Sequence, residues 1–246
     1  MLNSISDNYC LPNMHWKAIQ KEHSVNGMTN TLTTDPVSTV LQNLLTTEQE
    51  NDPAVFATVG GYPVDADAAQ RADLFKDVYM SVSETGGQLL YLLARATGAR
   101  TVVEYGTSFG VSTIYLASAV RDNGGGTVIG TELQPEKAAA AQRNFTDAGL
   151  ADVIDLRVGD ARETLADITG PVDLVLLDGW PELALPVLEI LEPRLRPGTL
   201  ILVDDVNLDF GHDAHGALRR YLAESDAYVA VTLPVSDGIQ ACVRLS

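Results

Sequence analysis

Short apolar runs alternate with longer amphipathic segments along the chain from residue 80 to the end. Runs rich in Val, Ile and Leu are typical of strands buried on both faces of a sheet. Five of them follow one another: TVVEYG at 101–106, TVIGTE at 127–132, VIDLRVGD at 153–160, VDLVLLD at 172–178 and TLILVDD at 199–205. Segments with apolar residues at helical spacing separate these runs. The alternation predicts an α/β fold, with a mostly parallel sheet and helices on both of its faces.

Glycine and proline mark where helices are expected to begin and end. Gly98 should stop a helix that starts near Ser83, and Pro135 and Gly149 should bound a later one. The last two apolar runs, at 228–234 and 239–246, lie close together in the sequence and could pair antiparallel.

The first 79 residues follow a different pattern. Residues 1–27 contain two of the four lysines and two of the four histidines, whereas all twelve arginines follow Met28. We take residues 1–27 as a leader of uncertain origin, either an upstream extension or a flap that caps the active site. Residues 28–79 are expected to form a helical cap, with helices over 36–49 and 65–80 and a loop over 51–65. Residues 80–246 then form the main domain.

Charge and composition exclude several classes of protein. The chain has 246 residues, 16 of them Lys or Arg and 33 Asp or Glu, which gives a net charge of −17 that disfavours nucleic acid and anionic membranes as partners. At 46% hydrophobic residues it is too apolar for a disordered chain. Apolar runs fall far short of the roughly 20 residues of a membrane helix. The two cysteines argue against a disulfide framework, and the first residues do not resemble a secretory signal. These features together predict a cytoplasmic protein.

In a parallel sheet of this kind, ligands bind outside the carboxyl ends of the strands. Gly106 and Gly110, after the first run, would let the backbone approach a ligand closely. Ser108 breaks the G-x-G-x-x-G pattern of dinucleotide-binding proteins, which disfavours a nicotinamide-dependent oxidoreductase. Glu132 could accept hydrogen bonds from ribose hydroxyls and Asp160 from an adenine amino group. The alternatives are a tight strand–helix turn for the glycines and helix capping for both acids.

Three further acids follow the fourth and fifth runs, namely Asp178, Asp204 and Asp205. Adjacent strands lie about 4.8 Å apart, so these carboxylates should converge on one small volume. Their mutual repulsion would raise at least one pKa, and a divalent cation such as Mg²⁺ would relieve it. The alternative is a helix cap at Asp178 and a polar turn at the other two.

In this order and spacing, the motifs resemble those of the class I S-adenosylmethionine-dependent methyltransferases. The likeness is to the catechol O-methyltransferase and caffeoyl-CoA O-methyltransferase group, and it runs from about Met80 to Ser246. It implies a Rossmann-like sheet of seven strands with an antiparallel last strand. It also implies S-adenosylmethionine as cofactor, contacted by Met80, Val82, Glu104, Gly106, Ser108, Gly110, Ser112, Glu132, Leu133, Asp160, Ala161, Asp178 and Trp180. The same resemblance makes Asp178, Asp204 and Asp205 the ligands of Mg²⁺ or another divalent cation.

Three positions depart from that group. The lysine that serves the catechol enzymes as general base is replaced by Pro181, a glutamate that holds the catechol by Val231, and the asparagine of the metal site by Asp205. Another proton acceptor is therefore needed, and the candidates Asp209, His212 and His215 follow the metal motif. The two histidines are three residues apart, on one face if that segment is helical, and histidine titrates near neutral pH. We expect His212 to matter more than His215; alternatives are two solvent-exposed histidines, or a metal that acts alone while water takes the proton.

The resemblance implies a metal-assisted transfer of a methyl group to a hydroxyl of a small molecule, an aromatic vicinal diol. Two alternatives remain open, a metal-independent methyltransferase with a histidine base and a catalytically inactive scaffold that binds the cofactor. Apolar faces on the N-terminal helices are consistent with a homodimer.

Overall fold

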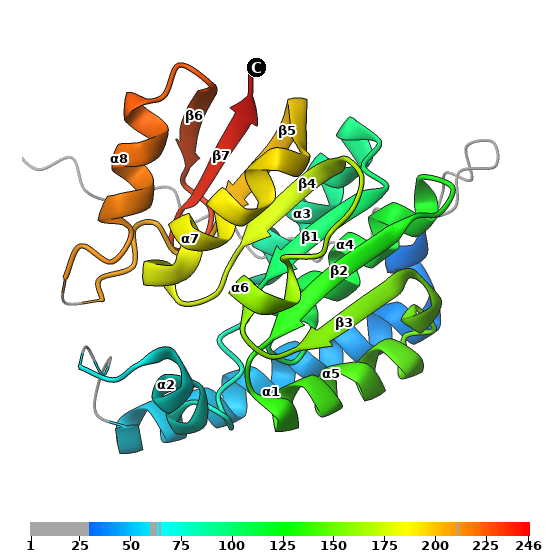
Figure 1. Cartoon of the computed structure of the whole chain (residues 1–246). Coiled ribbons are helices and arrows are strands. Elements are labelled where there is room, and N and C mark those ends of the chain that lie inside the picture. Colours follow the sequence, from blue (N-terminus) through cyan, green and yellow to red (C-terminus); the bar gives the residue numbers. More distant parts are fainter. Residues whose placement is uncertain (1–29, 60–62, 64, 211) are drawn as a thin grey trace, which may run out of the picture.

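The computed structural model describes residues 30–246 apart from 60–62, 64 and 211. The expected leader at 1–27 lies outside the described residues. Seven strands within the described ranges form one sheet in the order β3-β2-β1-β4-β5-β7-β6 (Figure 1). Their bounds are β1 Thr101–Tyr105, β2 Thr127–Glu132, β3 Ile154–Val158, β4 Val172–Leu177, β5 Leu195–Val203, β6 Tyr228–Leu233 and β7 Ile239–Arg244. The helices are α1 Asp35–Val59, α2 Ala68–Leu74, α3 Glu84–Thr97, α4 Val111–Asp122, α5 Pro135–Asp147, α6 Ala161–Thr164, α7 Pro181–Leu191 and α8 Gly216–Glu224.

The sheet confirms the expected Rossmann-like topology. Strands β1 to β5 pair in parallel, and β7 runs antiparallel to both β5 and β6. The strand order reverses beside β1, whose neighbours are β2 on one side and β4 on the other. Ligands of open α/β sheets bind in the crevice that such a reversal creates at the carboxyl ends of the strands.

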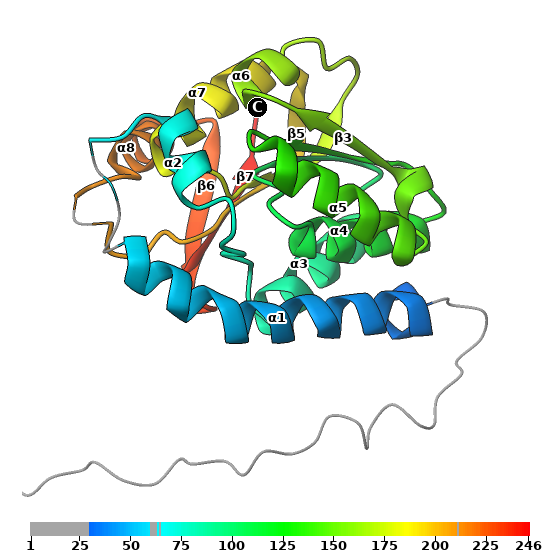
Figure 2. The same ribbon diagram turned by 90° about the horizontal axis from the view of Figure 1, so that it is seen from below.

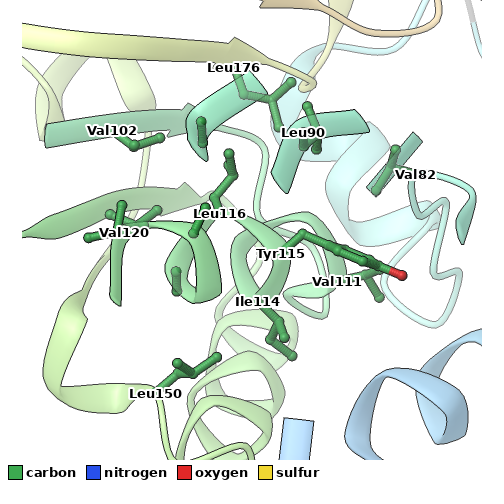
Figure 3. Packing of buried hydrophobic residues seen from close by; sticks show 14 of the residues in the cluster. Val82, Leu90, Val102, Val111, Ile114, Tyr115, Leu116, Val120, Leu150 and Leu176 are labelled. Atoms are coloured by element: carbon green, nitrogen blue, oxygen red, sulfur yellow. The ribbon is translucent and has the colours of Figure 1, made fainter. Parts of the chain in front are cut away.

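The two faces of the sheet bury separate apolar clusters because side chains alternate along each strand. In β1, Val102 packs into one cluster and Val103 into the other. The first cluster joins the sheet to residues of α1, α3, α4 and α5, and Figure 3 shows part of it around Leu116. The second lies under α6, α7 and α8. Burial on both faces explains why these strands read as continuous apolar runs. None of the helices in the described ranges is long and apolar enough to cross a membrane.

The N-terminal cap differs from its prediction. Helix α1 runs from Asp35 to Val59 and passes through Pro53, so the loop expected over 51–65 is wrong up to residue 59. A proline inside a helix removes one backbone hydrogen bond, but Phe56 beyond it packs against Phe75, with ring centroids 5.8 Å apart and the ring planes tilted by 52°. The two rings are 19 positions apart in the sequence, so no local pattern predicts their contact. Figure 2 shows α1 as a long helix that lies against α3, α4 and α5.

The second expected helix, over 65–80, is shorter than predicted. Helix α2 covers only Ala68–Leu74, and Asp67 and Gln70 close its amino end with a reciprocal capping box. After Leu74 the chain leaves the helix, and the side chains of Phe75 and Val78 are buried. The segment from Phe75 to Val82 therefore forms an irregular connection into α3.

Candidate active site

A cavity of about 490 Å³ opens at the carboxyl ends of the parallel strands. It collects residues from the N-terminal cap, the turn after β1, the end of β2, and the ends of β4 and β5. Nine of the residues expected to contact the cofactor line it: Met80, Val82, Gly106, Ser108, Ser112, Glu132, Leu133, Asp178 and Trp180. Four others do not line it, namely Glu104, Gly110, Asp160 and Ala161. The last two border a small cavity of about 30 Å³ that shares Leu133 and Trp180 with the large one.

The turn after β1 has a backbone that brings it close to β4. Gly106 has a φ of 95°, and a Cβ atom there would lie 2.4 Å from the carbonyl oxygen of Asp178. No larger residue fits without moving the ends of both strands. Gly110, with a φ of 93°, precedes the first residue of α4. Gly106 is thus required by close backbone approach, and Gly110 by its positive φ and by the Phe145 ring, which a Cβ atom there would approach to 2.3 Å. The amino end of α4 faces this edge of the sheet.

Glu104 anchors the same turn from inside the protein. Its carboxylate is fully buried and accepts hydrogen bonds from Thr107 Oγ1 at 2.8 Å and Ser112 Oγ at 2.7 Å. Burial raises the pKa of Glu104 above its usual value, which these hydroxyl donors partly offset. Because Glu104 does not line the cavity, its expected role as a direct cofactor contact stays a prediction.

Glu132 lies at the end of β2 between two backbone donors. Its carboxylate accepts from the amide of Ser108 at 2.7 Å and from the amide of Gln134 at 2.8 Å. Each carboxylate oxygen can accept a further hydrogen bond, and the residue lines the cavity. The cap of α5 is Gln134, whose side chain accepts from the amide of Glu136, so Glu132 is not itself the helix cap.

Asp160 does have capping geometry. Its side chain accepts from the amide of Arg162 at 2.8 Å at the start of α6, and it pairs with the Arg162 guanidinium. Hydrogen bonds from the Arg162 side chain hold the pKa of Asp160 below its usual value. A role toward an adenine amino group remains a prediction.

Asp178, Asp204 and Asp205 all line the large cavity. Burial raises the pKa of Asp178, and the charges of Asp204 and Asp205 raise it further. Burial also raises the pKa of Asp204 to about 6 and that of Asp205 to about 7. The cap of α7 is Trp180, so Asp178 is not held there as a helix cap. Across the described part of the chain, however, no three His, Cys, Asp or Glu side chains lie in a group that could hold a metal ion as they stand.

Asp237 and Lys137 belong to the cavity wall but were absent from the expected site. Asp237 lies in the β6–β7 turn and contributes to the raised pKa of Asp204 and Asp205. It reaches this edge because β7 is antiparallel and begins where the parallel strands end, which no local motif indicates. Lys137 is buried in the first turn of α5. The sequence contains one indication that it is unusual, namely that only two lysines follow residue 28. Burial lowers the pKa of Lys137.

The two candidate histidines lie in different surroundings. His215 lines the cavity and is only 6% exposed. Among the described residues, no group makes a well-aligned hydrogen bond to either of its ring nitrogens. Burial lowers its pKa, although the Asp205 backbone lies close enough to favour the charged ring. His212 does not line the cavity; its Nε2 lies 3.3 Å from Glu182 Oε1 and its Nδ1 3.1 Å from the Phe210 carbonyl oxygen. Helix α8 begins only at Gly216, so the segment with the two histidines is not helical and they do not share a helical face.

The backbone from Asp213 to Gly216 forms a turn, in which the Gly216 amide donates to the Asp213 carbonyl oxygen at 3.1 Å. The Asp213 carboxylate packs against Gly216, where a Cβ atom would lie 2.2 Å from its Oδ2. The two histidines therefore lie in the turn that precedes α8. Asp209, the third candidate for the base, does line the cavity.

An aromatic wall closes the cavity on the side of the N-terminal cap. The ring of Trp180 lies 6.0 Å from that of Phe75, and the Arg71 guanidinium lies 5.2 Å from the centre of the Trp180 ring. Phe56 and Phe210 add two further rings to the lining. Val231, at the position of the missing glutamate, is 58% exposed on β6 and does not line the cavity.

Comparison with known proteins identifies the family. A family model described as a methyltransferase domain matches residues 103–206. A catechol O-methyltransferase from Mycobacterium tuberculosis (strain ATCC 25618 / H37Rv) is 37% identical over 165 residues, which cover 65% of this chain and 74% of that protein.

Two solved structures extend the comparison. The O-methyltransferase from Bacillus cereus in complex with SAH has a TM-score of 0.64 at 26% identity, over 84% of this chain and 90% of that one. The O-methyltransferase TomG from Streptomyces achromogenes, in complex with SAM, has a TM-score of 0.62 at 25% identity, over 81% of this chain and 99% of that one. With a cavity at the switch point of the sheet and motifs in the same order, the chain belongs to the class I S-adenosylmethionine (SAM)-dependent O-methyltransferases of the catechol and caffeoyl-CoA O-methyltransferase group.

Proposed function

We propose that this SAM-dependent O-methyltransferase uses a divalent cation, Mg²⁺ or a similar ion, to methylate a hydroxyl of a small aromatic vicinal diol. The observation that carries the proposal is that Asp178, Asp204 and Asp205 reach one cavity from two adjacent strands. Burial raises the pKa of all three, and repulsion from neighbouring carboxylates raises it further, so their charged forms are disfavoured unless a cation is bound. The name of the Mycobacterium tuberculosis relative, a catechol O-methyltransferase, also supports it.

The donor set fits such an ion by its chemistry, because hard divalent cations prefer carboxylate oxygens and keep several waters. The carboxylates would have to move closer together to bind it, since they do not form a ligand group as they stand. When bound, the ion would lower the pKa of a chelated hydroxyl.

The residues of the chain supply positioning and proton transfer. The acceptor oxygen attacks the SAM methyl carbon, the carbon–sulfur bond breaks with its electron pair going to sulfur, and the hydroxyl proton must leave. Holding the two reactants in contact can supply about 7–11 kcal/mol of the barrier. The Trp180 and Phe75 rings would orient a flat acceptor. His215 is the best-placed proton acceptor because its ring reaches the cavity and its lowered pKa keeps it neutral near pH 7.

Asp204→Ala tests the metal role. We expect it to reduce turnover of a diphenol by at least about 10²-fold, because the ion loses a ligand, while SAM affinity measured by calorimetry changes little. Asp226→Ala is the matched control, because it removes an exposed aspartate at the opposite edge of the sheet, in the turn before β6. Wild-type turnover that persists in excess chelator would contradict the metal role.

A metal-independent methyltransferase is the second candidate. It is favoured by the unsatisfied ring of His215 and by the lack of a ready ligand group among the described residues. In that case chelator would leave turnover unchanged and His215→Ala would abolish it. Activity lost to chelator and restored by Mg²⁺ would exclude this candidate.

A further inference from the structure

Two carboxylates of α1 hold the chain segment that forms one edge of the cavity. Asp52 Oδ1 accepts from the amide of Tyr79 at 2.9 Å, and its Oδ2 accepts from the amide of Met80 at 2.9 Å. Glu48 Oε1 accepts from the next amide, that of Ser81, at 2.7 Å. The two acids are four residues apart and thus lie on the same face of the helix. Three consecutive backbone donors therefore bind to one helix face, and Asp52 is only 6% exposed.

The segment needs such support because its backbone is strained. Met80 has a φ of 46°, a left-handed conformation that a long side chain rarely adopts. Backbones of this kind cost free energy and persist only where their surroundings hold them, often at binding sites. Met80, Ser81 and Val82 all line the cavity. The carboxylates thus maintain the backbone at a wall of the cofactor cavity without reaching the cavity themselves.

The same segment is linked to the turn after β1 through Ser108. The Ser108 hydroxyl donates to the Tyr79 carbonyl oxygen at 2.7 Å, and the Ser108 amide donates to Glu132 at 2.7 Å. Ser108 is itself left-handed, with a φ of 48°. The ring of Tyr79 stacks on Phe109 with centroids 4.1 Å apart. A continuous chain of contacts therefore joins α1 to the carboxylate at the end of β2.

We propose that Asp52, assisted by Glu48, is a positioning residue for SAM, which prepares the 79–82 edge of the cavity before the cofactor binds. With the edge already held, SAM does not bear the free-energy cost of ordering it. The proposal rests on SAM binding alone. It is independent of the metal ion, the acceptor and the proton acceptor proposed above.

The test compares Asp52→Ala, Asp52→Asn and Glu48→Ala by calorimetric titration with SAM, without metal or acceptor. We expect Asp52→Ala to weaken SAM binding by about tenfold or more. Asp52→Asn should recover part of that affinity because its amide oxygen can still accept from a backbone donor. Turnover at saturating SAM should stay within about twofold of wild type, which gives a change in KM without one in kcat. Glu50→Ala is the matched control: an exposed acid on the same helix, it should bind SAM as wild type does.

A second measurement separates positioning from a loss of folding. Hydrogen exchange at the Met80 and Ser81 amides should accelerate in Asp52→Ala while exchange within β1 and β4 stays slow. In a double-mutant cycle, Asp52→Ala and Ser108→Ala should be non-additive in SAM affinity because they act on one chain of contacts. Wild-type SAM affinity in Asp52→Ala would overturn the proposal. If that variant does not fold, wild-type affinity in Glu48→Ala would overturn it instead.

Discussion

At the scale of single residues, His215 has the least satisfied side chain in the site. Its ring is buried against the cavity, while the ring of His212 is held at Glu182 and the Phe210 carbonyl. From the sequence we expected His212 to matter more, and the burial of His215 at the cavity leads us to propose the opposite order. Which of two nearby histidines faces a cavity depends on the turn before α8, and spacing alone does not specify it.

We therefore predict that His215→Ala lowers kcat by about 10²-fold or more, the usual contribution of a general base, whereas His212→Ala stays within about threefold. Since burial lowers the pKa of His215 below 6.5, the wild-type rate should be flat above pH 6.5 and fall below the lowered pKa as the ring becomes charged. A pH–rate profile of the three proteins at saturating SAM measures both effects. Wild-type rates in both variants would remove histidine from the mechanism.

At the scale of elements, helices α3 and α4 pack tightly where Gly87 meets the ring of Tyr115. A Cβ atom on Gly87 would lie 2.2 Å from that ring. Figure 3 shows Tyr115 on α4 within this cluster. The helical pattern predicted both helices, and α3 ends at Gly98 as expected. The distance between the two helices depends on Gly87, and the helical spacing of apolar residues does not indicate that a glycine is needed there.

Gly87→Ala should destabilise the protein by about 1–3 kcal/mol, the cost of overpacking a close contact. The sign is informative, because glycine to alanine inside a helix ordinarily stabilises by about 0.5–1 kcal/mol. Urea unfolding measures the difference, with Thr85→Ala, an exposed site in the first turn of the same helix, as control. Unchanged or raised stability in Gly87→Ala would mean that the two helices can separate at little cost.

At the scale of the whole molecule, negative charge dominates. The net charge is −17, and several acids at one edge of the sheet are partly buried. The charge balance predicted poor affinity for phosphate backbones from composition alone. The gathering of acids from β4, β5 and the β6–β7 turn depends on strand order, which brings residues distant in sequence to one edge.

We predict that, without divalent cations, the free energy of unfolding falls as pH rises from about 4 to about 7. In that window the folded protein holds protons on Asp204, with a pKa of about 6, and Asp205, with a pKa of about 7, whereas unfolded aspartates titrate near 3.9. Each such group contributes up to about 1.4 kcal/mol per pH unit. His215 acts in the opposite direction below pH 6.5 because its folded pKa is lowered.

Urea unfolding at several pH values in 0.5 M salt, which screens surface charge, measures this slope. Asp205→Asn should flatten it, and Asp226→Asn should leave it unchanged. A slope that is the same in all three proteins would show that the buried carboxylates do not govern it.

Local patterns were sufficient for the parallel strands, the antiparallel end of the sheet, most helices and the acids at the strand ends. Strand burial and helix capping depend on residues close together in the chain, so the order of apolar, polar and capping residues predicts them. Only the tertiary structure showed that α1 continues through Pro53 and that His215 is the histidine at the cavity. It alone also placed Lys137 and Asp237 in the cavity wall and Asp52 behind it. Each of these features arises where segments far apart in the chain meet. The free energy of such a contact depends on both segments, so neither local sequence predicts it.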